Sequence, residues 1–281
     1  MAITAAQVKE LREMTGAGMM ECKKALTEAD ADMDKAVDLL REWGVAKVAK
    51  KAGRATNEGT VMALVSDDGK AGAVIELNCE TDFVGMNEKF KGYAEQIAKI
   101  ALDAKPADAE ALKANAEVEA LITDCVHVMG ENTQLSRAAY IESSAVCSYI
   151  HMGGKIGVLM QFEVEGIDPT ADAFKAYGRD VAMQVAAMSP VAPNREAVPA
   201  DVVEKELEIY KAQAAASGKP ENIQEKIATG RLEKFYAENC LTEQAFVKDG
   251  DLTIQSYTDK VAKELGGSIK VVDFVRYALG E

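Results

Sequence analysis

An internal repeat is the sequence feature that most restricts how this chain can fold. Residues from 73 onward align with residues from 157 onward at an offset of 84, without a gap. Ala73-Val74-Ile75 faces Gly157-Val158-Leu159, and Phe90-Lys91-Gly92-Tyr93 faces Phe174-Lys175-Ala176-Tyr177. Because the matched residues keep the same order of strand-like and helix-like segments, the chain is expected to contain two related units of one architecture.

Each unit reads as a strand hairpin, helices and a third strand. Strand-forming and helix-forming patterns predict strands at 60–65, 73–78 and 134–141 and helices at 87–102 and 107–128 in the first copy, and a hairpin at 145–162 and a helix at 171–188 in the second. A three-stranded antiparallel sheet covered by helices on one face is about the smallest such unit that is stable. The predicted fold class is therefore α+β.

The second copy carries an insertion before its third strand. Arg137-Ala138-Ala139-Tyr140 resembles Arg276-Tyr277-Ala278-Leu279 at an offset of 139, which leaves 55 additional residues inside the second copy. Helical runs at 200–216 and 222–235 flank the polar turn Ser217-Gly218-Lys219-Pro220. Two helices around a tight turn predict an antiparallel helical hairpin that projects from the body.

The N-terminal part, residues 4–44, reads as three short helices. Thr4 is a suitable N-cap, and Thr15-Gly16-Ala17-Gly18 interrupts the helical spacing of the apolar residues that follow Thr4. The third helix is expected to end at Gly44. The linker after it is expected to begin as helix and then become irregular, and its cluster of basic residues is interpreted as a solvated surface.

One loop separates the two copies in chemistry. Glu80-Thr81-Asp82-Phe83 faces Val164-Glu165-Gly166-Ile167, while the residues around both stretches agree. A loop that differs on a shared framework is the best candidate for a specific task. The alternative is structural: Phe83 lies under its own helix and Asp82 caps that helix.

Composition argues for binding rather than covalent chemistry. A formal charge of −14 opposes a nucleic-acid groove as the main surface. Two histidines and five scattered cysteines without a C-x-x-C pair provide no metal pattern and favour reduced thiols in a cytoplasmic protein. No apolar run approaches the roughly 20 residues of a membrane helix, and the first residues do not resemble a secretory signal. No cofactor is expected.

Several motifs in order resemble one family, the bacterial translation elongation factor Ts proteins. The segments that carry the resemblance cover nearly the whole chain and are 9–12, 15–26, 49–53, 78–84, 151–159, 217–220 and 274–277. The resemblance implies a ubiquitin-associated-like (UBA-like) three-helix domain at 1–45, a linker at 46–58, core subdomain N at 59–142 and core subdomain C at 143–281. It also implies a protruding coiled-coil hairpin at about 190–245 that could mediate dimerisation.

The resemblance further implies a guanine nucleotide exchange factor for elongation factor Tu, the GTPase that delivers aminoacyl-tRNA to the ribosome. Thr81, Asp82, Phe83 and Val84 would form the loop that displaces the GTPase's magnesium, with Phe83 as a wedge. The resemblance also implies that Met19, Met20 and Lys23 contact the nucleotide domain of the GTPase. It places His151 in a second contact region. A homodimer or a 2:2 complex is one expectation, with no direct nucleic-acid or membrane partner and no catalytic residue.

The sequence departs from the family pattern in two places, and two other functions are alternatives to this interpretation. Glu80 stands where the family commonly has Gln, and many relatives continue beyond the position of Glu281 into a helix that contacts the GTPase. One rival is a UBA-like adaptor without exchange activity, which would bury Asp82 and Phe83 as core. The other is a thiol-dependent redox enzyme that uses Cys79 or Cys147.

Overall fold

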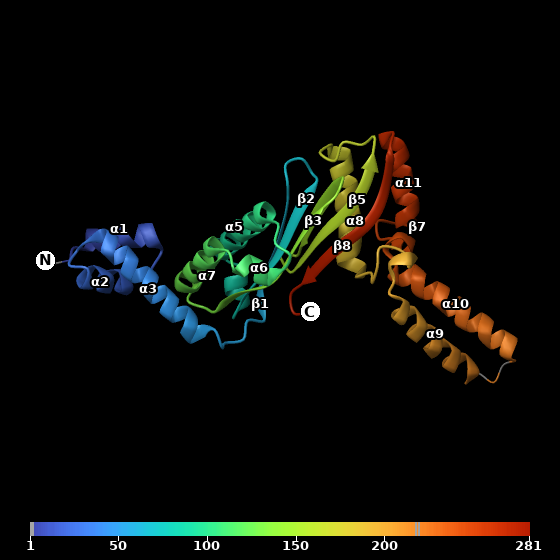
Figure 1. Ribbon diagram of the computed structural model, residues 1–281, viewed down its shortest axis with the longest axis horizontal. Helices are drawn as coiled ribbons and strands as arrows, with labels where there is room; N and C mark the ends of the chain where they lie inside the picture. The colour runs from blue at the N-terminus through green and yellow to red at the C-terminus, as the bar shows by residue number, and fades with distance from the viewer. Residues whose placement is uncertain (1–2, 217, 219) are drawn as a thin grey trace.

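A computed structural model describes residues 3–216, 218 and 220–281, without the side chains of residues 45–50 (Figure 1). Ser217 and Lys219 of the predicted turn, and the side chains of Lys47 and Lys50 in the basic stretch, lie outside the described residues. Figure 1 shows an elongated α+β molecule with a helical bundle at one end, two sheets in the middle and a pair of helices projecting from the other end.

Helices α1 (Ala5–Thr15), α2 (Met19–Glu28) and α3 (Met33–Lys51) form the N-terminal bundle. Thr4 accepts a hydrogen bond from the backbone N–H of Gln7, whose side chain reaches back to the Thr4 backbone, so α1 begins with a capping box. The apolar faces of the helices meet in a small core. Its fully buried side chains are Leu11, Cys22, Ala25, Leu26 and Ala36.

The predicted end of the third helix at Gly44 is wrong, because α3 continues to Lys51. A glycine inside a helix costs only about 1 kcal/mol relative to alanine, which packing can offset. A methyl group at Gly44 would lie 3.4 Å from Cγ2 of Thr123 on α7 (Ala116–Met129), an ordinary contact distance, so α3 packs beside α7 at this residue. The expectation that the linker begins as helix is confirmed.

The first sheet has the order β1 (Glu58–Val65), β2 (Ala71–Cys79), β3 (Thr133–Glu142), with both pairings antiparallel. Between β2 and β3 the chain forms α4 (Asp82–Gly85), α5 (Glu88–Ala104), α6 (Ala109–Lys113) and α7. These helices cover one face of the sheet. The core between the two layers includes the fully buried Ile75, Leu77, Phe90, Ile97 and Leu135.

The second sheet has the order β4 (Ala145–His151), β5 (Ile156–Glu165), β8 (Ser268–Ala278), again antiparallel. Helices α8 (Asp172–Met188) and α11 (Ile254–Leu265) pack on it. The helix-free faces of the two sheets pack against each other through Val61, Val74, Val146 and Leu159. The core is thus a four-layer arrangement of helices, sheet, sheet and helices.

The structure reproduces the offset of 84 in the long helices, whereas the first strands of the two copies correspond at 86, since Met62 pairs with Ile75 and Ser148 pairs with Leu159. Both ends of α8 lie 84 residues after the ends of α5. Lys105 and Ser189, the residues after these helices, both have left-handed backbone conformations, with φ of 52° and 45°. The offset deduced from sequence therefore describes a true structural equivalence.

The offset of 139 predicted between the third strands is wrong by two residues. Ile75 pairs with Ala138 and its equivalent Leu159 pairs with Val275, so the third strands correspond at an offset of 137. Side chains of a strand alternate between faces with a period of two. A shift of two residues keeps every side chain on its own face, so the sequence pattern does not distinguish the two alignments.

The insertion contains α9 (Ala200–Ala215) and α10 (Glu221–Asn239), which lie side by side and project away from the sheets (Figure 1). The short 3₁₀ helices Arg195–Ala197 and Leu241–Glu243 flank this pair, and strands β6 (Ala245–Phe246) and β7 (Asp249–Thr253) follow it. Arg195 bridges Glu233 of α10, at 2.7 Å, and Glu243 after it. The base of the projection is therefore tied to the body by charge as well as by apolar packing.

Candidate functional site

The Thr81-Asp82-Phe83-Val84 segment forms a tight turn of helix, α4, directly after β2. Thr81 is the N-cap residue, because its side chain accepts a hydrogen bond from the backbone N–H of Val84 at 3.4 Å. Phe83 is 80% exposed, and Asp82 is exposed as well. The structural alternative is therefore wrong on both counts: Thr81 rather than Asp82 caps the helix, and the ring of Phe83 does not lie under it.

The neighbours of Phe83 explain why its ring stays outside. Val84 packs against the core of the first sheet, and Gly85 is buried against Gly59 of β1. With these two residues turned inward, Phe83 and Met86 face the solvent, and Met86 is 56% exposed. Sequence reasoning missed Met86, although residues three apart on a helix share one face and the spacing from Phe83 gave the signal.

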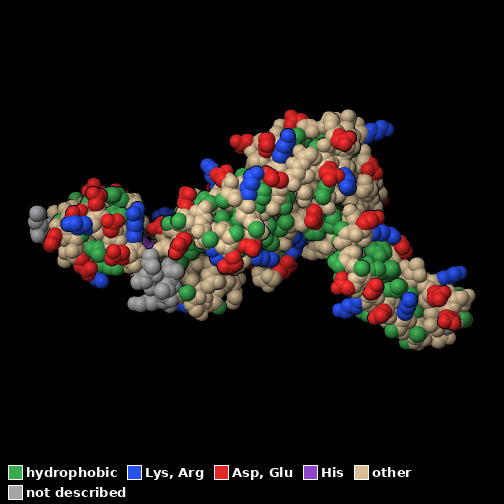
Figure 2. All heavy atoms as spheres, in the orientation of Figure 1, with side chains coloured by type: hydrophobic (Ala, Val, Ile, Leu, Met, Phe, Trp, Pro, Cys, Tyr) green, Lys and Arg blue, Asp and Glu red, His purple; other side chains and the backbone are tan. Residues whose placement is uncertain are grey.

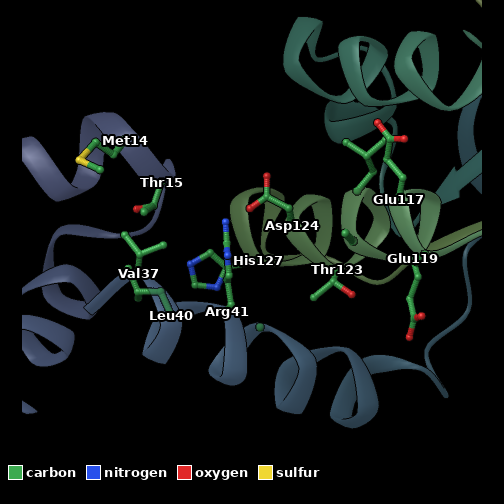
Figure 3. A pocket seen from close by; sticks show the side chains of 14 residues that line it. Met14, Thr15, Val37, Leu40, Arg41, Glu117, Glu119, Thr123, Asp124 and His127 are labelled. Carbon is green, nitrogen blue, oxygen red and sulfur yellow. The ribbon is translucent and has the colours of Figure 1, made fainter. Parts of the chain in front are cut away.

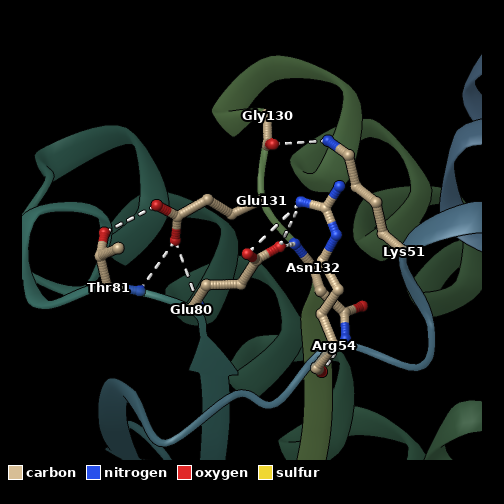
Figure 4. Close-up of polar contacts among 7 residues, drawn as sticks. All are labelled: Lys51, Arg54, Glu80, Thr81, Gly130, Glu131 and Asn132. Atoms are coloured by element: carbon tan, nitrogen blue, oxygen red, sulfur yellow. Dashed lines mark hydrogen bonds and ion pairs between the residues drawn. The ribbon is translucent and has the colours of Figure 1, made fainter.

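The linker after α3 reaches the base of this loop through Glu80 (Figure 4). The Arg54 guanidinium lies 3.2 Å from one carboxylate oxygen of Glu80, and the backbone N–H of Asn132 donates to the same oxygen at 2.7 Å. These contacts, the Asn132 hydrogen bond first, hold the pKa of Glu80 below its usual value. The charge of Glu80 thus faces Arg54 of the linker and the backbone of Asn132.

His151 ends β4 at the turn into β5. The residue is half-buried, and its Nδ1 lies 2.9 Å from the hydroxyl oxygen of Tyr149. Met152, the next residue, is 72% exposed and has a φ of 49°, a left-handed conformation that a non-glycine residue seldom adopts. The turn therefore presents a second large apolar side chain to solvent.

The first residues of β1 join this turn to the Phe83 loop. The backbone N–H of Val61 donates to the carbonyl of Gly154 at 2.7 Å, and Lys155 pairs with Glu58 at 2.8 Å. Gly59, between these contacts, is the residue against which Gly85 packs. The structure therefore brings the Thr81–Val84 loop and the His151 turn to the same end of the paired sheets.

Met19, Met20 and Lys23 lie at the start of α2, on the N-terminal bundle rather than on the sheets. Met19 is 56% exposed, Met20 is 76% exposed, and Lys23 is also exposed. Their helix buries its opposite face through Cys22, Ala25 and Leu26. These exposed methionines are not needed by the core of the bundle and remain available as a contact surface.

The bundle docks on α7 around a cavity of about 750 Å³ (Figure 3). Its lining combines Met14, Val37 and Leu40 of the bundle with Asp124 and His127 of α7. Glu21 Oε2 lies 3.6 Å from Nε2 of the buried His127, which links the bundle to α7. Figure 2 shows that basic Lys and Arg side chains are interspersed with acidic Asp and Glu side chains over the visible face of the molecule.

The thiols of the chain are buried, and burial opposes their ionisation. Desolvation raises the pKa of Cys79 to about 12, with the Glu131 carboxylate adding to the shift, and raises that of Cys147 to about 12. A reactive thiol needs a stabilised thiolate, so the redox enzyme receives no support. Among the described residues no cluster of three His, Cys, Asp or Glu could hold a metal ion, and no helix there is long and apolar enough to span a membrane.

The comparisons with known proteins agree on one family. The family model described as "Elongation factor TS" matches residues 80–281. A protein named elongation factor Ts from Trichlorobacter lovleyi is 49% identical over 291 aligned positions, which cover 100% of this chain and 94% of the relative. A protein of the same name from Clostridium botulinum is 47% identical and covers 99% of this chain and 93% of the relative.

Proposed function

The chain belongs to the elongation factor Ts family, and from this premise we propose that it is a guanine nucleotide exchange factor for elongation factor Tu. It binds the GDP-loaded GTPase and accelerates GDP release by displacing the magnesium ion there. The process requires binding energy and no covalent step. The cytoplasm, where translation occurs, is the proposed location.

The observation that carries this proposal is the exposed ring of Phe83. An aromatic side chain exposed to water, on a loop anchored to the protein by Val84 and Gly85, has no role in its own core. Aromatic residues that fill a partner's pocket are frequent hot spots of protein interfaces. The adaptor function would bury Asp82 and Phe83, and their exposure counts against it.

The energy required shows that Phe83 does not act alone. Accelerating release by about 10⁴-fold takes roughly 5.5 kcal/mol of interaction gained as the nucleotide site opens. Burying one phenylalanine side chain contributes about 1.5–3 kcal/mol. Further contacts must supply the remainder, and we assign them to Met86 beside the ring, to the His151 turn and to the Met19, Met20 and Lys23 surface.

Magnesium is a suitable target for a wedge. Mg²⁺ requires near-ideal octahedral geometry, so a small shift of a partner element that holds its ligands weakens binding sharply. Asp82, next to the ring, adds a negative charge where the loop enters the GTPase. There its carboxylate can bind positively charged groups of the GTPase that the departing phosphates release. Because coupling between sites is reciprocal, rebinding of nucleotide weakens the grip of the factor by the same free energy.

The domain assignments follow the same proposal. Residues 1–45 act as a UBA-like domain that contacts the nucleotide domain of the GTPase, and 46–58 serve as its linker. Subdomains N (59–142) and C (143–281) provide the loop and the turn. The α9–α10 pair, within the insertion at about 190–245, is the proposed surface for a homodimer or a 2:2 complex.

The test is the release of fluorescently labelled GDP from elongation factor Tu. Wild-type protein is expected to accelerate release, and Phe83→Ala to lose about tenfold or more of that acceleration, a barrier change of about 1.4 kcal/mol. Met188→Ala, which removes an exposed apolar side chain at the end of α8, is the control and should match wild type. No acceleration by wild type would reject the function, and equal rates for Phe83→Ala would reject the wedge.

A further inference from the structure

Glu131 contacts the Thr81–Val84 loop, named the exchange loop for its proposed role, from a distant part of the sequence. It lies between Gly130, which ends α7, and β3. One oxygen of its carboxylate accepts the backbone N–H of Glu80 at 3.1 Å and that of Thr81 at 3.0 Å, and the other accepts the Thr81 hydroxyl at 2.7 Å (Figure 4). A single half-buried side chain thus binds three donors of the residues that precede Phe83.

These donors have no place in the sheet. The ladder between β2 and β3 ends at the pair Cys79 and Thr133, so the N–H groups of Glu80 and Thr81 lie beyond it. Unpaired backbone donors away from water are unfavourable, and a carboxylate forms shorter and stronger hydrogen bonds than a neutral acceptor. Glu131 therefore fixes the backbone where the chain leaves the sheet and turns into α4.

A second carboxylate makes the reverse connection. Glu80 sends its side chain to the backbone N–H of Asn132, at 2.7 Å, while Glu131 binds the backbone of residues 80 and 81. The two chain segments are therefore joined in both directions, each through the carboxylate of one and the backbone of the other. Thr81, held at its N–H and its hydroxyl, is also the N-cap of the helix that carries Phe83.

We propose that Glu131 is the positioning residue of the exchange loop: it presents the Phe83 ring in the orientation that enters the GTPase and acts only through that loop. This inference rests on the proposed exchange function. Fixing a loop in its bound conformation before association removes the ordering cost that binding would otherwise carry. A site held this way depends on supporting residues that never touch the partner.

The first test compares substitutions of Glu131 in the GDP-release assay. Glu131→Ala removes all three acceptors and is expected to lower the exchange rate about tenfold, as expected for loss of a preorganised loop. Glu131→Gln is the rescue variant, because its amide oxygen can accept the two backbone N–H groups and its amide N–H can donate to the Thr81 hydroxyl oxygen. It should remain within about threefold of wild type. Glu142→Ala, at the other end of β3 with Lys105 as its partner, is the control and should exchange normally.

A double-mutant cycle separates positioning from general destabilisation. If Glu131 acts through the loop, Glu131→Ala should slow exchange by a smaller factor in the Phe83→Ala background than in wild type. Losses that multiply would overturn the inference, since Glu131 would then contribute independently of Phe83. Thermal melting of each variant checks that the fold is retained, and Glu131→Asp, which keeps the charge but shortens the reach, replaces Glu131→Ala if that variant does not fold.

A second readout does not depend on the GTPase. Amide hydrogen exchange of Glu80 and Thr81 should become faster in Glu131→Ala and return toward the wild-type rate in Glu131→Gln. Unchanged amide protection in Glu131→Ala would overturn the inference. If wild type fails to accelerate GDP release, the proposed function fails. If wild type accelerates it and Glu131→Ala does so equally, only the positioning role fails.

Discussion

A methyl group added at Gly85 would lie 2.8 Å from the carbonyl oxygen of Gly59. No pair of larger residues could bring α4 this close to β1. Gly59 is itself constrained, because its φ of 147° and a Cβ position 2.7 Å from Cα of Asn78 exclude a side chain. The two glycines therefore seat the short helix on the sheet and leave Phe83 directed outward.

Gly85→Ala is expected to push α4 away from β1. Overpacking of this kind costs about 1–3 kcal/mol, and the displaced loop should also exchange GDP more slowly. Gly92→Ala on α5, where a methyl group meets no heavy atom within 4 Å, is the matched control. It should be neutral or stabilise the protein by up to about 1 kcal/mol. Denaturant unfolding measures both, and an unaltered stability of Gly85→Ala would show that the backbone can move apart freely.

The helices and strands of this fold could be predicted from local patterns, but the end of α3 and the register of β8 could not. The hairpins, the long helices and the offset of 84 follow from apolar periodicity, which the folded core reproduces in Phe90 and Phe174. Past Gly44, α3 continues to Lys51 and packs beside α7, a helix that lies far along the sequence. The register of β8 depends on the ladder with β5, since a shift of two residues leaves the apolar pattern intact.

In the candidate site, likewise, the loop could be predicted from the sequence, but the residues that support it could not. The difference between the repeats at Thr81–Val84 located the loop, and the resemblance to a family named His151 and the α2 surface. The support of the loop is tertiary and has no local signal. Glu131 lies 50 residues from Thr81 in sequence, and the Gly59–Gly85 contact joins β1 to α4. A sequence pattern does not give such distances.

Phe83→Ala should leave the stability of the protein unchanged. Its ring is 80% exposed, so its removal opens no cavity. Phe90→Ala is the contrasting variant, because Phe90 is fully buried in the core of the first sheet, where truncation costs about 3–5 kcal/mol. Chemical denaturation of both variants measures the difference. A loss comparable to that of Phe90→Ala would mean that Phe83 packs inside the protein in solution.

Glu80→Gln should exchange GDP nearly as well as wild type. Glutamine can still accept the backbone N–H of Asn132, and the lost pairing with the exposed Arg54 is worth at most about 1 kcal/mol. Glu80→Ala leaves the Asn132 N–H without that acceptor, at a cost of about 1–3 kcal/mol. The free energy of unfolding and the rate of GDP release are measured for both variants. A strong exchange defect in Glu80→Gln alone would show that the charge itself acts on the GTPase.

Cys79 should behave as a protected thiol, although it lies two residues before the exchange loop. Burial raises its pKa to about 12, and its Sγ contacts the carbonyl of Thr81 at 3.2 Å. At pH 8 far fewer Cys79 thiols are therefore ionised in the folded protein than in an ordinary cysteine with a pKa near 8.5. A thiol reagent should therefore label Cys79 slowly in the native state, faster as the pH rises, and rapidly in denaturant.

Cys79→Ala should retain GDP release, because a redox mechanism needs this sulfur and a wedge mechanism does not. Rapid native labelling together with loss of exchange in Cys79→Ala would favour the thiol chemistry that the buried position argues against.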